Sequence, residues 1–162
     1  MAEQKTKTEE ITLNADKDGL WDKGTKVSLT LKIWDCAGTE EFASIQHMYF
    51  QDALAAVVCY SIDSRHSYKR LKNWIDRVDE SREDCIKYVI GNKNDYSEEL
   101  RAVKEEEGQN FADKNECTFR ETSAKEDLDG INSLFSDLTY DCAELLLRNK
   151  LTNKQRPTGM KL

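Results

Sequence analysis

The chain has no excess of positive charge, few histidines and no long apolar run, and each of these shortages excludes a class of protein. Its 162 residues carry a net charge of −7, and the sequence pI is about 5.0. Nucleic-acid-binding surfaces need clustered basic charge, so this composition leaves no electrostatic footprint for DNA or RNA. No apolar run approaches the roughly 20 residues of a membrane-spanning helix, and the first residues are not those of a signal peptide. The sequence predicts a cytoplasmic protein without a nucleic-acid partner.

Patterns typical of zinc sites, disulfides and reactive thiols are missing as well. The five cysteines have no C-x-x-C spacing and lie in apolar or strand-like stretches, which predicts buried, reduced thiols. Cys59 and Cys117 are expected to be small apolar residues inside strands rather than nucleophiles, because neither has an adjacent base. His47 and His66 lie far apart and lack the ligand spacing of a zinc site.

Strand-like and helix-like stretches alternate along the chain. Residues 26–34 alternate apolar and polar, which predicts a half-buried strand paired with residues 9–13 as a hairpin that Trp21 covers. Residues 54–60 form a continuous apolar run, as interior parallel strands do, and residues 86–90 form another strand. An α/β fold with a mainly parallel sheet is therefore expected.

Three helices are expected between and after these strands. One is capped by Asp63 or Ser64, and another runs from Ser97 to Lys114. The last has an apolar face at helical spacing, made by Ile131, Leu134, Phe135, Leu138, Cys142, Leu145 and Leu146. We expect one domain over residues 1–150 with residues 1–8 frayed, followed by a basic flexible tail over residues 151–162.

The strand at residues 86–90 leads into a compact polar cluster. Ligands of α/β proteins bind at the carboxyl ends of such strands. There Asp95 can accept two parallel N–H bonds from a ligand edge with adjacent donors, a pair that guanine offers and adenine does not. The apolar stem of Lys93 can lie along a base, and Asn92 can tie neighbouring loops together. The cluster predicts recognition of guanine.

Two further stretches complete a family pattern. Residues 35–40, Asp-Cys-Ala-Gly-Thr-Glu, resemble the Asp-x-Ala-Gly-x-Glu segment of small GTPases. Residues 121–125, Glu-Thr-Ser-Ala-Lys, resemble the loop that closes over guanine from the other side. With Asn-Lys-x-Asp between them, in the family's order, the chain resembles a Rab-type small GTPase of the Ras superfamily over roughly residues 25–147. The Rab-like character rests on the aromatic residues Trp34, Phe42, Tyr49, Phe50 and Trp74.

The resemblance implies a three-layer, P-loop-NTPase-like fold that binds GTP or GDP with magnesium. The implied base-binding residues are Asn92, Lys93, Asp95, Ser123, Ala124 and Lys125. Ala37 and Gly38 align with the segment whose glycine amide senses the γ-phosphate, although Gly38 is also explained by a tight turn. Asp35 aligns with the aspartate that reaches magnesium through water, or equally caps the following turn. Trp34, Phe42, Tyr49 and Phe50 would form a surface for Rab-type effectors or regulators.

Several residues depart from the family pattern. Thr39 stands where the family usually has the glutamine that orients the attacking water, and threonine is too short and lacks the amide. We therefore expect slow unaided hydrolysis and name no catalytic residue. Cys36 and Glu41 differ from the usual threonine and arginine, which weakens the transfer of Rab partner choice.

The largest departure is the phosphate loop. No G-x-x-x-x-G-K-[ST] motif occurs in the 162 residues, although this motif supplies the family's amide nest, lysine and hydroxyl for phosphates and magnesium. We therefore expect the first βα unit, which carries a central strand, to be missing. Either the strands ending at Trp34 and Tyr60 close up, or another chain pairs with the exposed edge, or the sequence is a truncated product.

The sequence also has no prenylation signal, because its last cysteine, Cys142, lies in the last expected helix. A basic tail without a lipid binds membranes only weakly. The leading hypothesis is a pseudo-GTPase that acts through protein contacts, in keeping with the vesicle trafficking of Rab proteins. The alternatives are a GTP-hydrolysing switch completed by a further segment or a partner chain, and a non-functional product.

Overall fold

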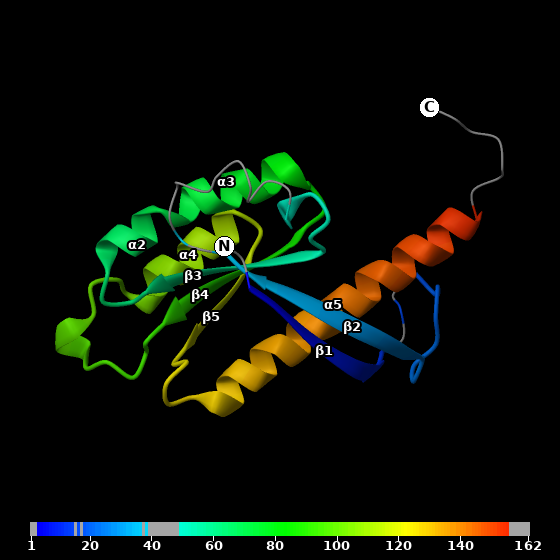
Figure 1. Cartoon of the computed structure of the whole chain (residues 1–162), viewed down its shortest axis with the longest axis horizontal. Coiled ribbons are helices and arrows are strands. Elements are labelled where there is room, and N and C mark those ends of the chain that lie inside the picture. Colours follow the sequence, from blue (N-terminus) through cyan, green and yellow to red (C-terminus); the bar gives the residue numbers. More distant parts are fainter. Residues whose placement is uncertain (1–2, 15, 17, 37, 39–48, 156–162) are drawn as a thin grey trace. The chain divides into compact units, whose positions relative to one another are not determined.

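The computed structural model describes residues 3–14, 16, 18–36, 38 and 49–155. Its described residues form two compact units, one drawn from Met1–Cys36 and Ser136–Leu162 and the other from Ala37–Phe135. We call them the hairpin unit and the sheet unit. The elements in chain order are β1 (Glu3–Thr12), β2 (Lys26–Asp35), β3 (Ala55–Ser61), α2 (Arg65–Lys69), α3 (Leu71–Ser81), β4 (Ile86–Asn92), the 3₁₀ helix η2 (Glu98–Leu100), α4 (Glu105–Lys114), β5 (Thr118–Thr122) and α5 (Leu128–Gln155) (Figure 1).

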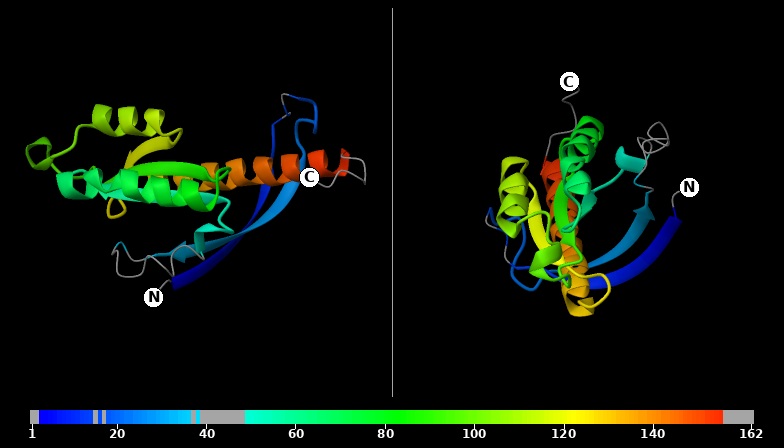
Figure 2. Two further views of the ribbon diagram at one scale, coloured as in Figure 1. Left: turned by 90° about the horizontal axis from the view of Figure 1, so that it is seen from above. Right: turned by 90° about the vertical axis from the view of Figure 1, so that its left-hand side faces the viewer.

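The hairpin unit is built on a long antiparallel ribbon. β1 pairs with β2 from Glu3 opposite Asp35 to Thr12 opposite Lys26, and the two strands run side by side in each view (Figure 2). Burial alternates along β2, which confirms the half-buried strand expected at residues 26–34. The expected fraying of residues 1–8 is wrong for residues 3–8, because their backbone pairs with the far half of β2.

The hairpin and part of α5 form one apolar cluster. Leu13, Trp21 and Ala143 are buried in it, and Val27 and Leu29 from β2 pack against them. The Trp21 indole N–H donates to the carbonyl of Asn14 at 2.8 Å, which satisfies its one polar group. Trp21 therefore covers the hairpin as expected, and α5 contributes residues to this core from Tyr140 to Leu151.

The sheet unit contains the parallel sheet, in the order β3-β4-β5. The central strand β4 is buried on both faces, at Tyr88, Val89 and Ile90. α3 packs against β3 and α4 against β5 (Figures 1 and 2). The buried members of the core on this side of the sheet are Tyr60, Ile62, Leu71, Ile75, Val89, Val103 and Ala112.

β3 differs from the interior strand expected at residues 54–60. Among the described residues it pairs with β4 alone, and its side chains alternate, with Val57 and Cys59 exposed. The expectation that Cys59 is buried was wrong because this strand lies at the end of the described sheet. Cys117 is half-buried, and desolvation raises the pKa of its thiol to about 11. None of the five cysteines, all in the described part of the chain, forms a disulfide.

The described strands belong to two separate sheets, β1-β2 and β3-β4-β5. β2 belongs to the hairpin unit and β3 to the sheet unit, so which of the three ways replaces the missing central strand stays a prediction.

Helix boundaries differ from expectation where local contacts override helical propensity. Ser64 caps α2, its side chain accepting from the Ser67 amide, and a break at Arg70 separates α2 from α3. The helix expected from Ser97 to Lys114 is only η2 and α4. Residues 101–104 between them are not helical, and the amides of Ala102 and Val103 both donate to the Ile62 carbonyl at 2.8 and 3.0 Å.

The last helix shows the expected apolar face with some exceptions. Leu134, Leu138 and Cys142 are buried, whereas Leu146 is exposed. α5 also continues to Gln155, so residues 151–155 of the expected tail are helical. No helix among the described residues combines the length and apolarity needed to cross a bilayer.

Candidate guanine-recognition site

Two loops leave the same edge of the parallel sheet. In the ladders, Ser61 is level with Asn92, and Asn92 is level with Thr122, so the three strands end together. The amide of Asn94 donates to the Thr122 carbonyl at 3.1 Å, which continues this pairing beyond the strands. We call residues 92–96 the lysine loop and residues 122–126 the serine loop. The parallel register therefore places the two predicted base-binding stretches next to each other.

The Asn92 side chain links the two loops. Its amide oxygen accepts from the backbone N–H of Lys93 at 2.8 Å and from that of Ala124 at 3.0 Å. An amide oxygen has two lone pairs, so these two bonds use its full accepting capacity. The tie between neighbouring loops expected of Asn92 is present, and it holds the main chain of Ala124 in place.

Ser123 shapes the serine loop from inside. Its side chain is buried, and its hydroxyl oxygen accepts from the amides of Lys125 and Glu126 at 3.3 and 3.0 Å. Its carbonyl accepts from the Asp127 amide at 2.9 Å, just before α5 begins. In this arrangement Ser123 acts on the shape of the loop and exposes Ala124 and Lys125 at its surface.

Lys93 has an unusual backbone. Its φ of 70° is in the left-handed region, which costs a residue with a Cβ roughly 1–2 kcal/mol. The bond from its amide to Asn92 and a 3.0 Å bond from the Tyr96 amide to its carbonyl hold this conformation. Strained backbone of this kind is concentrated at functional sites.

The Lys93 ammonium has two partners that sequence reasoning did not assign to the site. Its Nζ lies 3.7 Å from Asp63 Oδ2 and 5.4 Å from the centroid of the Tyr96 ring. Asp63 was considered only as a helix cap, a role that Ser64 takes. The position of Asp63 in the sequence could have indicated this role, because Asp63 follows the end of β3, at the sheet edge where the lysine loop begins.

Asp95 is half-buried and keeps its bonding capacity. Within the described ranges, no residue hydrogen-bonds or ion-pairs with its carboxylate. The bond to Glu126 and, more weakly, the negative charge of Asp95 raise the pKa of Lys125. Two carboxylate oxygens can accept two parallel N–H bonds. The Asp95 carboxylate thus offers two acceptor oxygens to a ligand. It stands on the lysine loop, whose backbone Asn92 ties to the serine loop.

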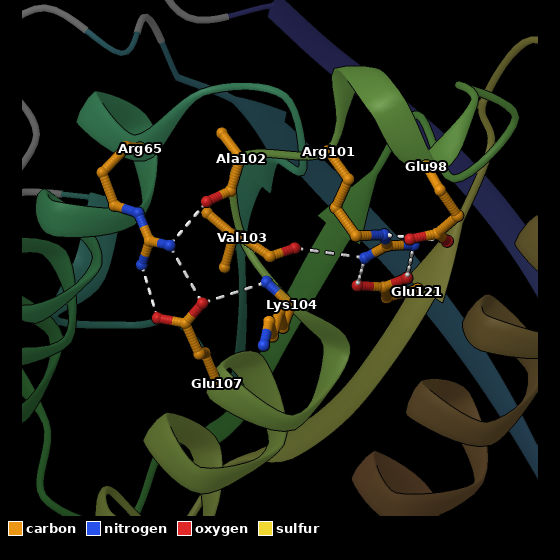
Figure 3. A network of polar contacts seen from close by, with 8 residues as sticks. All are labelled: Arg65, Glu98, Arg101, Ala102, Val103, Lys104, Glu107 and Glu121. Atoms are coloured by element: carbon orange, nitrogen blue, oxygen red, sulfur yellow. Dashed lines mark hydrogen bonds and ion pairs between the residues drawn. The ribbon is translucent and has the colours of Figure 1, made fainter.

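Arg101 stabilises the strand from which the serine loop emerges. Its guanidinium donates to both carboxylate oxygens of Glu121 at 2.8 and 2.9 Å, and both side chains are largely buried, at 13% and 7% exposed. The bidentate bond to Glu121 raises the pKa of Arg101. Arg101 also donates to the Val103 carbonyl at 3.2 Å and lies 3.3 Å from Glu98 (Figure 3). Sequence reasoning missed this pair, although Glu121 is the first residue of the family stretch at 121–125.

A second arginine holds the other end of the same segment. Arg65 donates to both oxygens of Glu107 and to the Ala102 carbonyl, and Glu107 also accepts from the Lys104 amide at 3.1 Å (Figure 3). The bond from Arg65 is the main reason that the pKa of Glu107 is lowered to about 2. Arg65 and Glu107 together therefore hold residues 102 and 104 in place.

The remaining predicted residues lie outside this cluster. Asp35 and Trp34 end β2 in the hairpin unit, where both are exposed, Trp34 at 43%. Tyr49 and Phe50 are half-buried in the sheet unit, and the Gly38 carbonyl accepts from Arg70 at 3.0 Å. Ala37, Thr39 and Phe42 lie outside the described residues.

The family resemblance implies magnesium, and a role for Asp35 towards it stays a prediction. The described ranges contain no group of three or more His, Cys, Asp or Glu side chains that could hold a metal ion. We derive no chemistry through a metal.

Comparison with known proteins agrees with the motifs. The model of the Ras family matches residues 3–144. Ras-related protein RABE1d from Arabidopsis thaliana is 32% identical over 135 residues, covering 83% of this chain and 61% of the relative. Ras-related protein Rab-17 from Mus musculus is 36% identical over 133 residues, covering 80% and 59%. Rab-10 from Caenorhabditis elegans is 36% identical over 126 residues, covering 77% and 59%.

The chain thus spans about three-fifths of the length of these curated relatives. The family match nevertheless covers both the hairpin unit and the sheet unit, and it includes the motifs that form the lysine loop. The chain belongs to the Ras family of small GTPases, and its relatives are Rab proteins.

Proposed function

We propose that this chain recognises the guanine base through the lysine and serine loops and acts mainly through protein contacts. The observation that carries the proposal is the open carboxylate of Asp95 in the lysine loop, which Asn92 ties to the serine loop. Guanine presents adjacent N1–H and N2–H donors to such a carboxylate, whereas adenine has an acceptor at the corresponding ring nitrogen. Asp95 is thus the specificity residue, and Lys93 and Ala124 frame the base.

The charges around the loops favour the base over the phosphates as the main source of affinity. The Lys93, Lys125 and Arg101 side chains each have a carboxylate partner, namely Asp63, Glu126 and Glu121. The sequence adds no phosphate-loop motif, and Thr39 cannot replace the water-orienting glutamine. We therefore propose weak binding of GDP or GTP and negligible hydrolysis by this chain alone.

Protein partners of the Rab type fit the exposed aromatic residue at the end of β2. Trp34 is 43% exposed, and large exposed aromatic side chains are favoured at protein interfaces. With Phe42, Tyr49 and Phe50, this residue would serve effectors or regulators of vesicle trafficking. We propose a cytoplasmic protein that reaches endomembranes through such partners.

A second candidate function is a nucleotide switch completed by a further segment or a partner chain. Two observations favour it, namely that β3 has one ladder partner, β4, among the described residues, and that the chain spans three-fifths of its Rab relatives. A strand donated by another chain, or by a second copy, would pair at the sheet edge, as exposed edges allow. In this case stoichiometric nucleotide binding appears only in the completed assembly.

The first test is nucleotide content and base preference. The chain is purified natively with magnesium and denatured, and the released nucleotides are chromatographed. The native protein is then titrated with guanosine and adenosine. We expect no stoichiometric nucleotide, weak binding of guanosine, and no binding of adenosine or of guanosine to Asp95→Ala.

Three other results would contradict the proposal. Near-stoichiometric GDP or GTP would show that phosphates are held after all. A cooperatively folded chain that binds no guanosine would exclude guanine recognition, and only the proposed role through protein contacts would remain. A chain without a cooperative unfolding transition would indicate a non-functional product.

A further inference from the structure

We propose that Asp63 is a positioning residue for guanine recognition, which holds the Lys93 ammonium so that the lysine stem presents a fixed surface to the base. The inference rests on the proposed guanine binding and adds a residue to it. Its basis is the geometry at the ends of β3 and β4.

The parallel register brings the two residues together. Ser61 is level with Asn92 in the β3–β4 ladder, and the Ile62 amide donates to the Asn92 carbonyl at 3.1 Å just beyond it. Asp63 lies two residues beyond β3, and Lys93 directly follows β4. The register of the sheet thus brings a carboxylate beside the lysine, and Ser67 of α2, which bonds Ser61 and Ser64, supports the turn that contains it.

The two oxygens of Asp63 have separate partners. The Ser61 hydroxyl donates to Oδ1, and Oδ2 faces Lys93 Nζ at 3.7 Å. The bond from Ser61, followed by the charge of Lys93, lowers the pKa of Asp63. The carboxylate is thus oriented by its own strand and is negatively charged at neutral pH.

Lys93 is held at both ends. Its backbone is fixed by Asn92 and Tyr96, and its ammonium by Asp63 and the Tyr96 ring. A left-handed turn by itself would be served by glycine or asparagine. A lysine with a restrained ammonium has less conformational freedom left to lose when a base settles on its stem, so base affinity increases.

The charge of Lys93 is balanced by a carboxylate, so in this structure the side chain serves the base more than a phosphate. The contact with the base is common to guanosine and GDP. The loss of the restraint on the lysine stem should therefore weaken the binding of both.

The test compares two matched charge removals in the full chain. Asp63→Asn removes the partner of Lys93, and Asp76→Asn removes the partner of Lys72 in an exposed i,i+4 pair on α3. Guanosine and GDP affinities are measured by NMR chemical-shift titration. We expect Asp63→Asn to weaken both about threefold, as for partly exposed ion pairs, and Asp76→Asn to change neither.

A double-mutant cycle separates positioning from general stability. In a Lys93→Ala background, Asp63→Asn should have no further effect on guanosine affinity, because the residue through which it acts is gone. Ser61→Ala releases Oδ1 while keeping the charge and should weaken binding less than Asp63→Asn. This variant also keeps the proposal testable if Asp63→Asn does not fold.

The outcomes distinguish the two levels of the argument. If neither the unmodified chain nor Asp76→Asn binds guanosine, the proposed function fails and this inference fails with it. If the unmodified chain binds and Asp63→Asn or Ser61→Ala binds equally well, only the inference is overturned. An undiminished effect of Asp63→Asn in the Lys93→Ala background would also overturn it.

Discussion

Asp95 and Glu107 are both carboxylates of the sheet unit, and the protein uses them in opposite ways. Both carboxylate oxygens of Glu107 accept hydrogen bonds, from Arg65 and from the Lys104 amide. Asp95 has no such bond to any residue that the structure describes. A group that is already satisfied contributes to stability, whereas an open one is available to a ligand. The two residues therefore call for different measurements.

Substitution Asp95→Asn should change which base is bound. An amide offers one acceptor and one donor, so it mismatches the two donors of guanine but matches xanthine, which has N1–H beside a carbonyl. The loss of a hydrogen bond to a charged acceptor predicts at least about tenfold weaker guanosine binding. Titration of both proteins with guanosine and xanthosine checks this, and unchanged guanosine affinity would exclude Asp95 from the site.

Substitution Glu107→Gln should lower stability only where Glu107 is ionised. Its pKa in the folded protein is about 2, below that of the unfolded chain, so its stabilising contribution is complete above about pH 5 and disappears towards pH 2. Thermal unfolding of both proteins between pH 7 and pH 2 should show a difference in Tm that closes on acidification. A difference independent of pH would mean that shape, not charge, is responsible.

At the scale of elements, α4 carries a glycine for a packing reason. A Cβ on Gly108 would lie 2.5 Å from both Phe119 Cζ and Tyr60 Oη. Tyr60 is buried and Phe119 packs against the same core, so neither ring can move freely. Glycine lets α4 approach β3 and β5 closely, although it is a poor helix former.

Gly108→Ala should therefore destabilise the protein despite the better helix propensity of alanine. Overpacking costs about 1–3 kcal/mol, against a gain of roughly 1 kcal/mol from propensity. We expect a net loss of up to about 2 kcal/mol in the free energy of unfolding. Asn110→Ala, at an exposed position of the same helix, is the control and should be neutral or slightly stabilising.

The Arg101–Glu121 pair joins the segment before α4 to the end of β5. Arg101→Met would leave the largely buried Glu121 carboxylate without its partner, and we expect a loss of about 2–3 kcal/mol in denaturant unfolding. Arg101→Met with Glu121→Leu should recover part of that loss, because no buried charge remains. A double variant as unstable as the sum of its parts would contradict this account.

Local sequence patterns predicted the helices and strands well, but they did not predict the contacts that these elements make with distant parts of the chain. Alternation in β2, the apolar face of α5 and the Asn-Lys-x-Asp cluster were readable because each depends on neighbouring residues. The non-helical run at residues 101–104 and the exposure of Cys59 were not, since they depend on the Ile62 carbonyl and on which strands pair. The contact of Asp63 with Lys93 likewise joins residues 30 positions apart, through a parallel register that a sequence does not display.

At the scale of the whole molecule, α5 belongs to both units. Its residues up to Phe135 group with the sheet unit and those from Ser136 with the hairpin unit, within one unbroken helix. A helix shared in this way couples the stability of the two units. We therefore expect them to unfold together.

This coupling can be measured with Trp21, which is buried in the hairpin unit. In the variant Trp34→Phe/Trp74→Phe, Trp21 fluorescence reports on that unit, while far-UV circular dichroism reports largely on the helices of the sheet unit. The two probes should give the same denaturant midpoint, as in a two-state transition. Separate midpoints would show that α5 breaks at its middle.

The division of the chain also determines the order of folding during synthesis. Residues of the sheet unit are contiguous, so all of its strands are translated before Ser136. The β1–β2 ribbon precedes them in this chain but must wait for the second half of α5 to cover Leu13 and Trp21. The ribbon is thus translated before the sheet unit and completes its core after it, so its apolar face stays exposed for longer during synthesis.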